Sequence, residues 1–293
     1  MRIERFFQII TSGAVLIMGT VLPEVSIAET TLPKIASLDY CSDQYVLALA
    51  KRSQVTALSI HATTDFSFYA DRAKGLPQTS DSIENLIHLK PDVVVRYWGG
   101  NARMRSILKR TNIQIISADT GLNVQSVLDN VTIFSKAFDR VPQGIAFNQN
   151  YQDRVARLST DHGKGLRAIY LSQNGTTAGK GTFPDEVITM AGLTNAISEM
   201  GIKGWRTLPL ESLILNPPDI IIGSFFESSD LNKSNWGVIR HGVIQRMFKT
   251  IPTIFVPGRL FACRTFSFID AAEYVIANLQ HMNLKPIPGG TKP

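Results

Sequence analysis

The sequence contains few cysteines and few charged residues. The first shortage limits the number of disulfides, and the second bears on whether the chain folds. Two cysteines allow at most one disulfide within the chain. Charged residues make up 18% of the chain and hydrophobic residues 44%, a balance that argues against intrinsic disorder. The formal net charge is +6, but the lysines and arginines are scattered and form no basic run, so we predict no nucleic-acid partner. An anionic small ligand, or solubility alone, explains the charge equally well.

Catalytic motifs are also missing from the sequence. It contains no G-x-S-x-G nucleophile elbow, no H-E-x-x-H zinc motif and no Walker loop. The glycine-rich stretch 175–181 lacks the G-x-G-x-x-G order and is predicted to be a flexible loop. Of the five dispersed histidines, only His61 and His241 could face a ligand, which is too few for a histidine-rich zinc site. We therefore predict a protein that is not an enzyme and holds no cofactor or metal of its own.

The N-terminus has the pattern of a secretory signal peptide. Arg2 and Arg5 precede an apolar, uncharged segment, Phe6–Leu22, and Ser26-Ile27-Ala28 offers small residues at the usual positions of a cleavage site. A membrane anchor is the alternative, but the segment is shorter than the roughly 20 residues of a spanning helix, and two glycines interrupt it. No cysteine follows it to carry a lipoprotein anchor. We predict cleavage after Ala28 and an exported, soluble protein.

The two cysteines, Cys41 and Cys263, could pair in an exported protein, because that compartment permits disulfides. Such a bridge would join widely separated parts of the chain, which the sequence alone cannot establish. Two free thiols are the simpler interpretation.

A duplicated segment organises the rest of the chain. Residues 83–95 read IENLIHLKPDVVV and residues 210–222 read LESLILNPPDIII, an offset of 127 positions. In each copy a glutamate stands in the first turn of a predicted short helix, where a negative charge suits the helix dipole. A proline then ends the helix, and three β-branched residues predict a strand buried on both faces of a parallel sheet.

Further strands and helices complete each copy. Strands are predicted at 35–38 and 168–171 before the duplicated segment and at 113–117 and 253–256 after it. Helices are predicted after the opening strands, at 44–50 and 185–191. Alternating strands and helices predict an α/β fold with two mostly parallel sheets.

A helical pattern separates the two copies. Apolar residues recur at helical spacing from Val124 to Phe138, and Pro142 can occupy the first turn of a second helix that runs to Thr160. That helix would be roughly 28 Å long at 1.5 Å per residue, enough to join two lobes rigidly. An ordinary surface helix within one domain is the alternative. We predict a signal peptide at 1–28, an N-terminal lobe at 29–141, a connecting helix at 142–160 and a C-terminal lobe at 161–293.

Parallel sheets bind ligands beyond the carboxyl ends of their strands, which selects a candidate site. The residues in or beside these predicted loops combine aromatic rings with arginines: Tyr40, Cys41, Arg96, Tyr97, Trp98, Trp205, Arg206, Phe225, Arg259 and Arg264. The rings would stack on a planar or bulky ligand, and the arginines would pair with carboxylate or phosphate groups. The alternative is that each ring anchors a loop and each arginine is solvated.

Two features resemble a known family, the periplasmic binding proteins for ferric siderophores, haem and cobalamin. Residues 83–102, with Gly99-Gly100-Asn101-Ala102, resemble the cobalamin-binding members. Trp205, six residues before Glu211, matches a position where those members carry a ligand-facing tryptophan. The resemblance covers about 32–279. It implies a monomeric periplasmic protein with two Rossmann-like lobes joined by one long helix, and a ligand held between them.

The resemblance also implies an ABC importer as the partner. In the family each lobe presents a glutamate to arginines of the membrane permease, and Glu84 and Glu211 match those glutamates. A capping box at Asp81–Glu84 is the alternative for the first of them. The expected function is capture of a small-molecule metal chelate or corrinoid and its delivery to the permease and its ATPase.

The identity of the ligand stays open at this stage. The arginines favour an anionic ferric chelate, whereas the Gly-Gly-Asn segment and Trp205 favour a corrinoid. Tyr97 stands where cobalamin binders carry a tryptophan, with Trp98 one place later. The alternative functions are binding of a bare metal or an oxyanion such as molybdate, a periplasmic enzyme on the same two lobes, and a sensor that docks a receptor.

Overall fold

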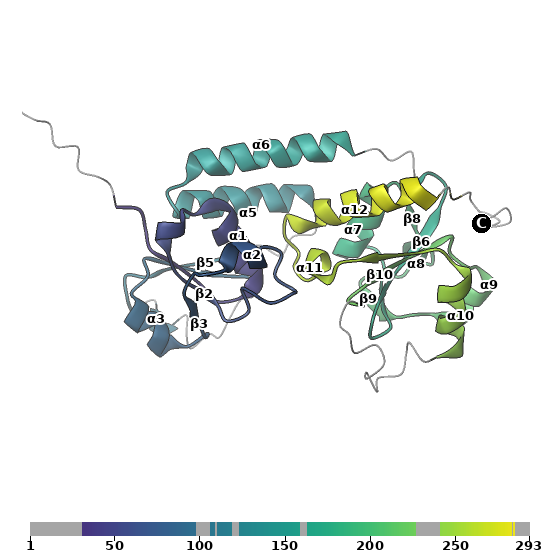
Figure 1. Cartoon of the computed structure of the whole chain (residues 1–293), viewed down its shortest axis with the longest axis horizontal. Coiled ribbons are helices and arrows are strands. Elements are labelled where there is room, and N and C mark those ends of the chain that lie inside the picture. The colour runs from purple at the N-terminus through teal and green to yellow at the C-terminus, as the bar shows by residue number, and fades with distance from the viewer. Residues whose placement is uncertain are drawn as a thin grey trace, which may run out of the picture. The chain divides into compact units, whose positions relative to one another are not determined.

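Strands and helices alternate along the chain, as Figure 1 shows for this computed structural model. The structure describes residues 31–97, 106–108, 110–118, 123–158, 163–226, 241–282 and 284. The chain divides into two units, 1–31 and 32–293, and the second holds every element named below. The predicted signal peptide, and Trp98 with the Gly-Gly-Asn-Ala segment, lie outside the described residues.

The first lobe is built on a five-stranded parallel sheet with the strand order β3-β2-β1-β4-β5. Its strands are β1 (Ile35–Ser37), β2 (Val55–Ser59), β3 (Gln78–Thr79), β4 (Val93–Arg96) and β5 (Gln114–Ser117). Its helices include α1 (Tyr40–Leu49), η1 (Arg52–Gln54), α2 (Ala70–Ala73) and α3 (Ile83–Leu89). The Val93–Val95 run is buried, as expected for a central strand of a parallel sheet with both faces covered.

The second lobe contains a four-stranded parallel sheet with the order β11-β10-β6-β8 and a two-stranded antiparallel sheet of β7 and β9. Its strands are β6 (Arg167–Ser172), β7 (Thr176–Ala178), β8 (Thr194–Asn195), β9 (Trp205–Thr207), β10 (Ile220–Ser224) and β11 (Thr253–Val256). Its helices include α7 (Phe183–Met190), α8 (Ala196–Glu199), α9 (Leu210–Leu215), α10 (Gly242–Thr250), α11 (Gly258–Phe261) and α12 (Ser267–Met282).

The sequence duplication reappears in the strand pairing. In the first lobe β4 lies between β1 and β5, and in the second lobe β10 lies between β6 and β11. Ile35 of β1 stands opposite Val93 of β4, and Ala168 of β6 stands opposite Ile220 of β10. The prediction of an α/β fold with two Rossmann-like lobes, mostly parallel sheets and one long connecting helix is confirmed.

The connecting helix is α6 (Val141–Arg157), slightly shorter than the predicted 142–160 and with Pro142 in its first turn. It pairs with α5 (Val124–Ala137), which precedes it, and the two helices lie side by side in Figure 1. Asn148 of α6 donates hydrogen bonds to the carbonyl of Leu128 (3.0 Å) and to Oγ1 of Thr132 (3.1 Å). These contacts fix the connector to the first lobe. The exact lobe boundaries remain a prediction.

Close approach of α5 and α6 depends on one glycine. A Cβ atom on Gly144 would collide with the side chain of Ser135. The turn between the two helices contains Asp139 in the left-handed region (φ 55°), and the amide of Arg140 donates to the carbonyl of Ser135 at 2.7 Å. A larger residue at position 144 would therefore push the helices apart.

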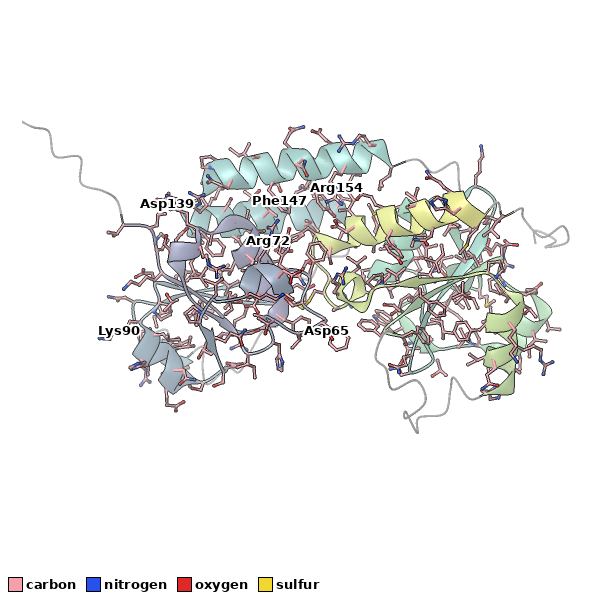
Figure 2. The ribbon with its side chains drawn as sticks, in the orientation of Figure 1. Asp65, Arg72, Lys90, Asp139, Phe147 and Arg154 are labelled. Carbon is pink, nitrogen blue, oxygen red and sulfur yellow. A yellow bond between two sulfur atoms is a disulfide. The ribbon has the colours of Figure 1, made fainter. Side chains whose placement is uncertain are left out.

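Helix α12 fastens the connector to the second lobe. Arg154 of α6 pairs with Asp270 (2.8 Å) and with Glu273 (2.6 Å), both on α12. Figure 2 labels Arg154 on α6, together with Phe147, which packs edge-on against Phe266 at 5.0 Å between ring centres. The sequence patterns did not predict α12, which carries both acidic partners of Arg154.

The stretch 175–181, predicted to be a flexible loop, is ordered, and that prediction was wrong. It contains β7, which pairs with β9 from Thr176↔Thr207 to Ala178↔Trp205. The hydroxyl of Thr177 donates to the carbonyl of Tyr170 at 2.6 Å, which ties the small sheet to β6. The glycines serve turns at its ends, with Gly175 and Gly181 at positive φ.

Candidate functional site

Asp39 organises the loop that follows β1. One of its carboxylate oxygens accepts a hydrogen bond from the amide of Ser42 at 2.8 Å and so caps α1, which begins at Tyr40 rather than at the predicted residue 44. The other oxygen accepts from the amide of Tyr97 at 2.8 Å, just beyond β4. Asp39 therefore joins the loops at the carboxyl ends of two neighbouring strands. Sequence reasoning did not single it out, although an aspartate just before a helix is a common capping signal.

Two predicted residues at the end of β4, Arg96 and Tyr97, make contacts inside the protein. The Tyr97 side chain is 1% exposed, and its hydroxyl donates to the carbonyl of Arg264 at 2.7 Å. Arg96 is 8% exposed and pairs with the carboxylate of Asp81 at 3.1 Å. In this structure both residues hold loops in place. For Tyr97 this agrees with the alternative that the aromatic rings anchor loops and do not contact a ligand. Tyr40 is half-buried, and burial, together with the charge of Asp39, raises the pKa of its hydroxyl, which therefore stays neutral.

Cys41 and Cys263 form a disulfide, so the interpretation as two free thiols was wrong. The sulfur–sulfur distance is 2.08 Å, the Cα atoms are 5.5 Å apart, and the bridge spans 222 residues. Both cysteines are buried. Cys41, predicted as a ligand contact, therefore offers no thiol and instead links the start of α1 to the segment after α11.

The segment Cys263–Phe266 of the second lobe is built into the core of the first. Beside the disulfide, the hydroxyl of Thr265 bonds the side chain of Gln44. Phe266 is buried in an aromatic cluster whose other rings are Tyr45, Phe68, Tyr69 and Phe147, with centre-to-centre distances of 5.0–5.9 Å. This anchoring fixes the backbone on both sides of Arg264, whose side chain is half-buried. No local pattern predicts it, because the partners are far apart in sequence.

The Trp205 side chain packs against other aromatic rings of the second lobe. The indole is half-buried and meets the rings of Tyr170 (5.8 Å) and Phe183 (5.9 Å) edge-on. Phe261 packs against the same two rings from α11. Arg206 is exposed, and its guanidinium donates to the Trp205 carbonyl at 3.0 Å. A rigid, partly exposed ring of this kind can stack on a flat ligand at little cost in conformational entropy.

Phe225 and Phe66 bring the loops of the two lobes together. Phe225 follows β10 and has a φ of 66°, a left-handed conformation that costs a non-glycine residue about 1–2 kcal/mol. Its ring lies 5.8 Å from that of Phe66, which is 44% exposed and follows β2 in the first lobe. Asp65, the chain neighbour of Phe66, is labelled in Figure 2. The sequence patterns did not predict β2, so Phe66 is not among the predicted ligand contacts.

Three of the arginines predicted to pair with a ligand, Arg206, Arg259 and Arg264, lie in the second lobe. Arg259 on α11 is exposed. Lys74 and, to a smaller extent, Arg259 lower the pKa of the Asp71 carboxyl, which places Arg259 within electrostatic reach of α2 in the first lobe. Arg206 and Arg259 are exposed and Arg264 is half-buried, so all three present positive charge at least partly to solvent.

Glu84 and Glu211 are exposed in the first turns of α3 and α9. The capping box proposed for Asp81–Glu84 does not form. Ser82 is the cap of α3 and accepts a hydrogen bond from the amide of Asn85 at 3.1 Å, so Glu84 has no part in the cap. Helix capping therefore does not account for a glutamate at position 84.

Membrane-spanning helices and clusters of metal-binding side chains are both absent from the described residues. Among the described residues, no helix is both long and apolar enough to cross a membrane. Within the same ranges, histidine, cysteine, aspartate and glutamate side chains nowhere gather in threes that could hold a metal ion.

The amino-acid sequence matches the model of a known protein family. The family model described as periplasmic binding protein matches residues 35–247, more than two thirds of the chain. The chain therefore belongs to the periplasmic binding protein family, and the resemblance inferred from the sequence is confirmed.

Individual relatives agree with this assignment. The vitamin B12-binding protein of Salmonella typhi is 23% identical over 217 residues, which cover 70% of this chain and 77% of that protein. The periplasmic heme-binding protein HutB of Vibrio cholerae has a TM-score of 0.70 at 17% identity, over 84% of this chain and 98% of that one. The periplasmic vitamin B12-binding protein BtuF of Vibrio cholerae has a TM-score of 0.63 at 18% identity, over 85% and 97%. At these identities the solved structures establish a common fold.

Proposed function

We propose that this chain is the periplasmic substrate-binding component of an ABC importer and that it captures a flat or macrocyclic metal chelate. The candidates are cobalamin, haem and a ferric siderophore. One observation carries the proposal: partly exposed aromatic rings come from both lobes, with Phe66 in the segment after β2, Phe225 directly after β10 and Trp205 at the start of β9. The names of the relatives, which bind vitamin B12 or haem, support the same ligand class.

The proposed binding mode needs no reaction. Aromatic rings would bury the apolar face of the ligand, and Arg206, Arg259 and Arg264 would pair with its carboxylates or phosphate. Because Trp205 is already held by Tyr170 and Phe183, little ordering would be needed on binding. We infer that the protein releases the ligand unchanged and is not an enzyme.

Delivery would use the two exposed glutamates. Glu84 and Glu211 occupy equivalent positions in the duplicated segments, one in each lobe. Two carboxylates on short, anchored helices can each accept a bidentate arginine fork from a permease. Export would remove residues 1–28, which N-terminal sequencing of protein from the periplasmic fraction can check.

Fluorescence titration of the purified protein with cyanocobalamin, haemin and a panel of ferric siderophores tests the ligand class. We expect one of them to quench tryptophan emission saturably with a dissociation constant of about 1 µM or lower. A Trp205→Phe variant identifies the share of the quenching that arises at that ring. Failure of all three classes to bind more tightly than about 1 mM would contradict the proposal.

A further inference from the structure

Helices α3 and α9 bury one apolar row against the sheets of their lobes. Leu86 of α3 is buried beside Ala36 and Val94, and Ile83 packs on the same cluster. The equivalent residues of α9, Leu213 and Leu210, belong to the core cluster of the second lobe. These residues form the face of each helix that packs against its lobe.

A second apolar position points outward in both helices. Ile87 of α3 is 50% exposed, and its equivalent in α9, Ile214, is 58% exposed. Each isoleucine follows an exposed glutamate by three residues, Glu84 or Glu211, so the two side chains share one helix face. A single exposed apolar residue needs no explanation. The same residue, beside the same carboxylate, at equivalent positions in two lobes suggests a shared role.

The residues just before both helices are bonded to residues at the carboxyl ends of strands. Asp81, just before α3, pairs with Arg96 at the end of β4. The amide of Leu208, just before α9, donates to the carbonyl of Gly175, just after β6, at 3.2 Å. Each glutamate–isoleucine pair therefore stands near the loops that would hold and release a ligand.

We propose that Ile87 in the first lobe and Ile214 with Leu215 in the second are apolar contacts of the permease, beside Glu84 and Glu211. This inference rests on the proposed function and adds the chemistry of the partner. The matching surface of the permease would carry, next to each arginine, an apolar side chain. Contact between the apolar groups excludes water from the neighbouring ion pair, which strengthens it above a solvated surface pair.

The outward faces of α3 and α9 differ at one position. Leu215, next to Ile214, is 79% exposed, whereas the equivalent residue of α3 is His88. The second lobe therefore offers a larger apolar surface than the first. We expect the second-lobe contact to contribute more to permease affinity.

Binding of the purified protein, without added ligand, to the importer's permease–ATPase complex in nanodiscs tests the inference. The variants are Ile87→Ser, Ile214→Ser and Leu215→Ser, with Ile87→Thr and Ile214→Thr as milder replacements. Ile145→Ser on α6, an equally apolar side chain that is 66% exposed, is the matched control. Ligand affinity and melting temperature are measured for every variant to confirm an intact fold.

The expected result is a loss of permease affinity of about 10-fold for each serine variant of the second lobe and a smaller loss for Ile87→Ser. Ile145→Ser should bind as the unaltered protein does. Unchanged affinity in all three serine variants, with weakened binding by Glu84→Ala and Glu211→Ala, overturns the inference and leaves the docking proposal standing. Unchanged affinity in the glutamate variants as well overturns both.

Discussion

The carboxylate of Asp92 accepts a hydrogen bond from the amide of Lys34 at 2.7 Å, immediately before β1. Asp219, its counterpart in the second lobe, accepts from the amide of Arg167, the first residue of β6, at the same distance. In each pair the aspartate amide also donates to the carbonyl of its partner at 2.8 Å. The Pro-Asp of each duplicated segment thus fixes the alignment of the two central strands.

Replacing either aspartate should weaken its own lobe. We expect Asp92→Ala and Asp219→Ala each to lower the free energy of unfolding by about 1–2 kcal/mol, because a hydrogen bond to a charged acceptor is lost. Asp153→Ala is a suitable control, because its carboxylate is exposed and accepts a hydrogen bond from the Gln149 side chain on the same helix. Urea denaturation followed by circular dichroism measures all three. Equal stability of the three variants would count against the structural role.

Removing the disulfide should destabilise the protein without abolishing its fold. Cys263→Ser, or reduction of the native protein, should lower the free energy of unfolding by about 2–4 kcal/mol, since the unfolded chain regains freedom over a long loop. Dithiothreitol should have no further effect on a Cys41→Ser, Cys263→Ser double variant. If reduction leaves the stability of the unaltered protein unchanged, the bridge does not constrain the chain as described.

Asp43 should make stability depend on pH. Burial raises the pKa of this carboxyl to about 6, although Ser59 donates hydrogen bonds to it from its hydroxyl and amide. Because the folded-state pKa lies above the unfolded one, the folded state holds the proton more tightly. The stabilisation is therefore complete below about pH 4 and is lost as the pH rises through 6.

An Asp43→Asn variant isolates this effect. The stability of the unaltered protein relative to Asp43→Asn should fall by up to about 3 kcal/mol between pH 4 and pH 7. Chemical denaturation at several pH values measures the difference. A difference that is constant with pH, or that grows with rising pH, would contradict the raised pKa.

Two substitutions of Phe225 distinguish the effect of backbone strain on stability from the effect of the ring on ligand binding. Both Phe225→Ala and Phe225→Gly remove the ring, but only glycine adopts the left-handed conformation without penalty. We expect the glycine variant to be more stable than the alanine variant by about 1 kcal/mol. Both should bind the ligand about 10-fold more weakly. Unaltered ligand affinity in both would remove Phe225 from the site.

The sequence was informative where residue patterns are local and repeated. The Pro-Asp-Val-Val-Val and Pro-Asp-Ile-Ile-Ile runs identified β4 and β10, and helical spacing identified α5 and α6. The short β3, β7, β8 and β9 span two or three residues each, too few to show alternation. Burial of Tyr97 and Cys41, and the meeting of Phe66 with Phe225, depend on contacts between distant segments that no local pattern carries.

Uptake of the ligand by cells that depend on this chain is the most direct test of its proposed role. A deletion strain is complemented with the unaltered protein or with the Glu84→Ala, Glu211→Ala double variant, and accumulation of the labelled ligand is measured. We predict that the double variant binds the purified ligand normally but restores no uptake. Normal uptake by the double variant, or normal uptake in the uncomplemented deletion strain, would contradict it.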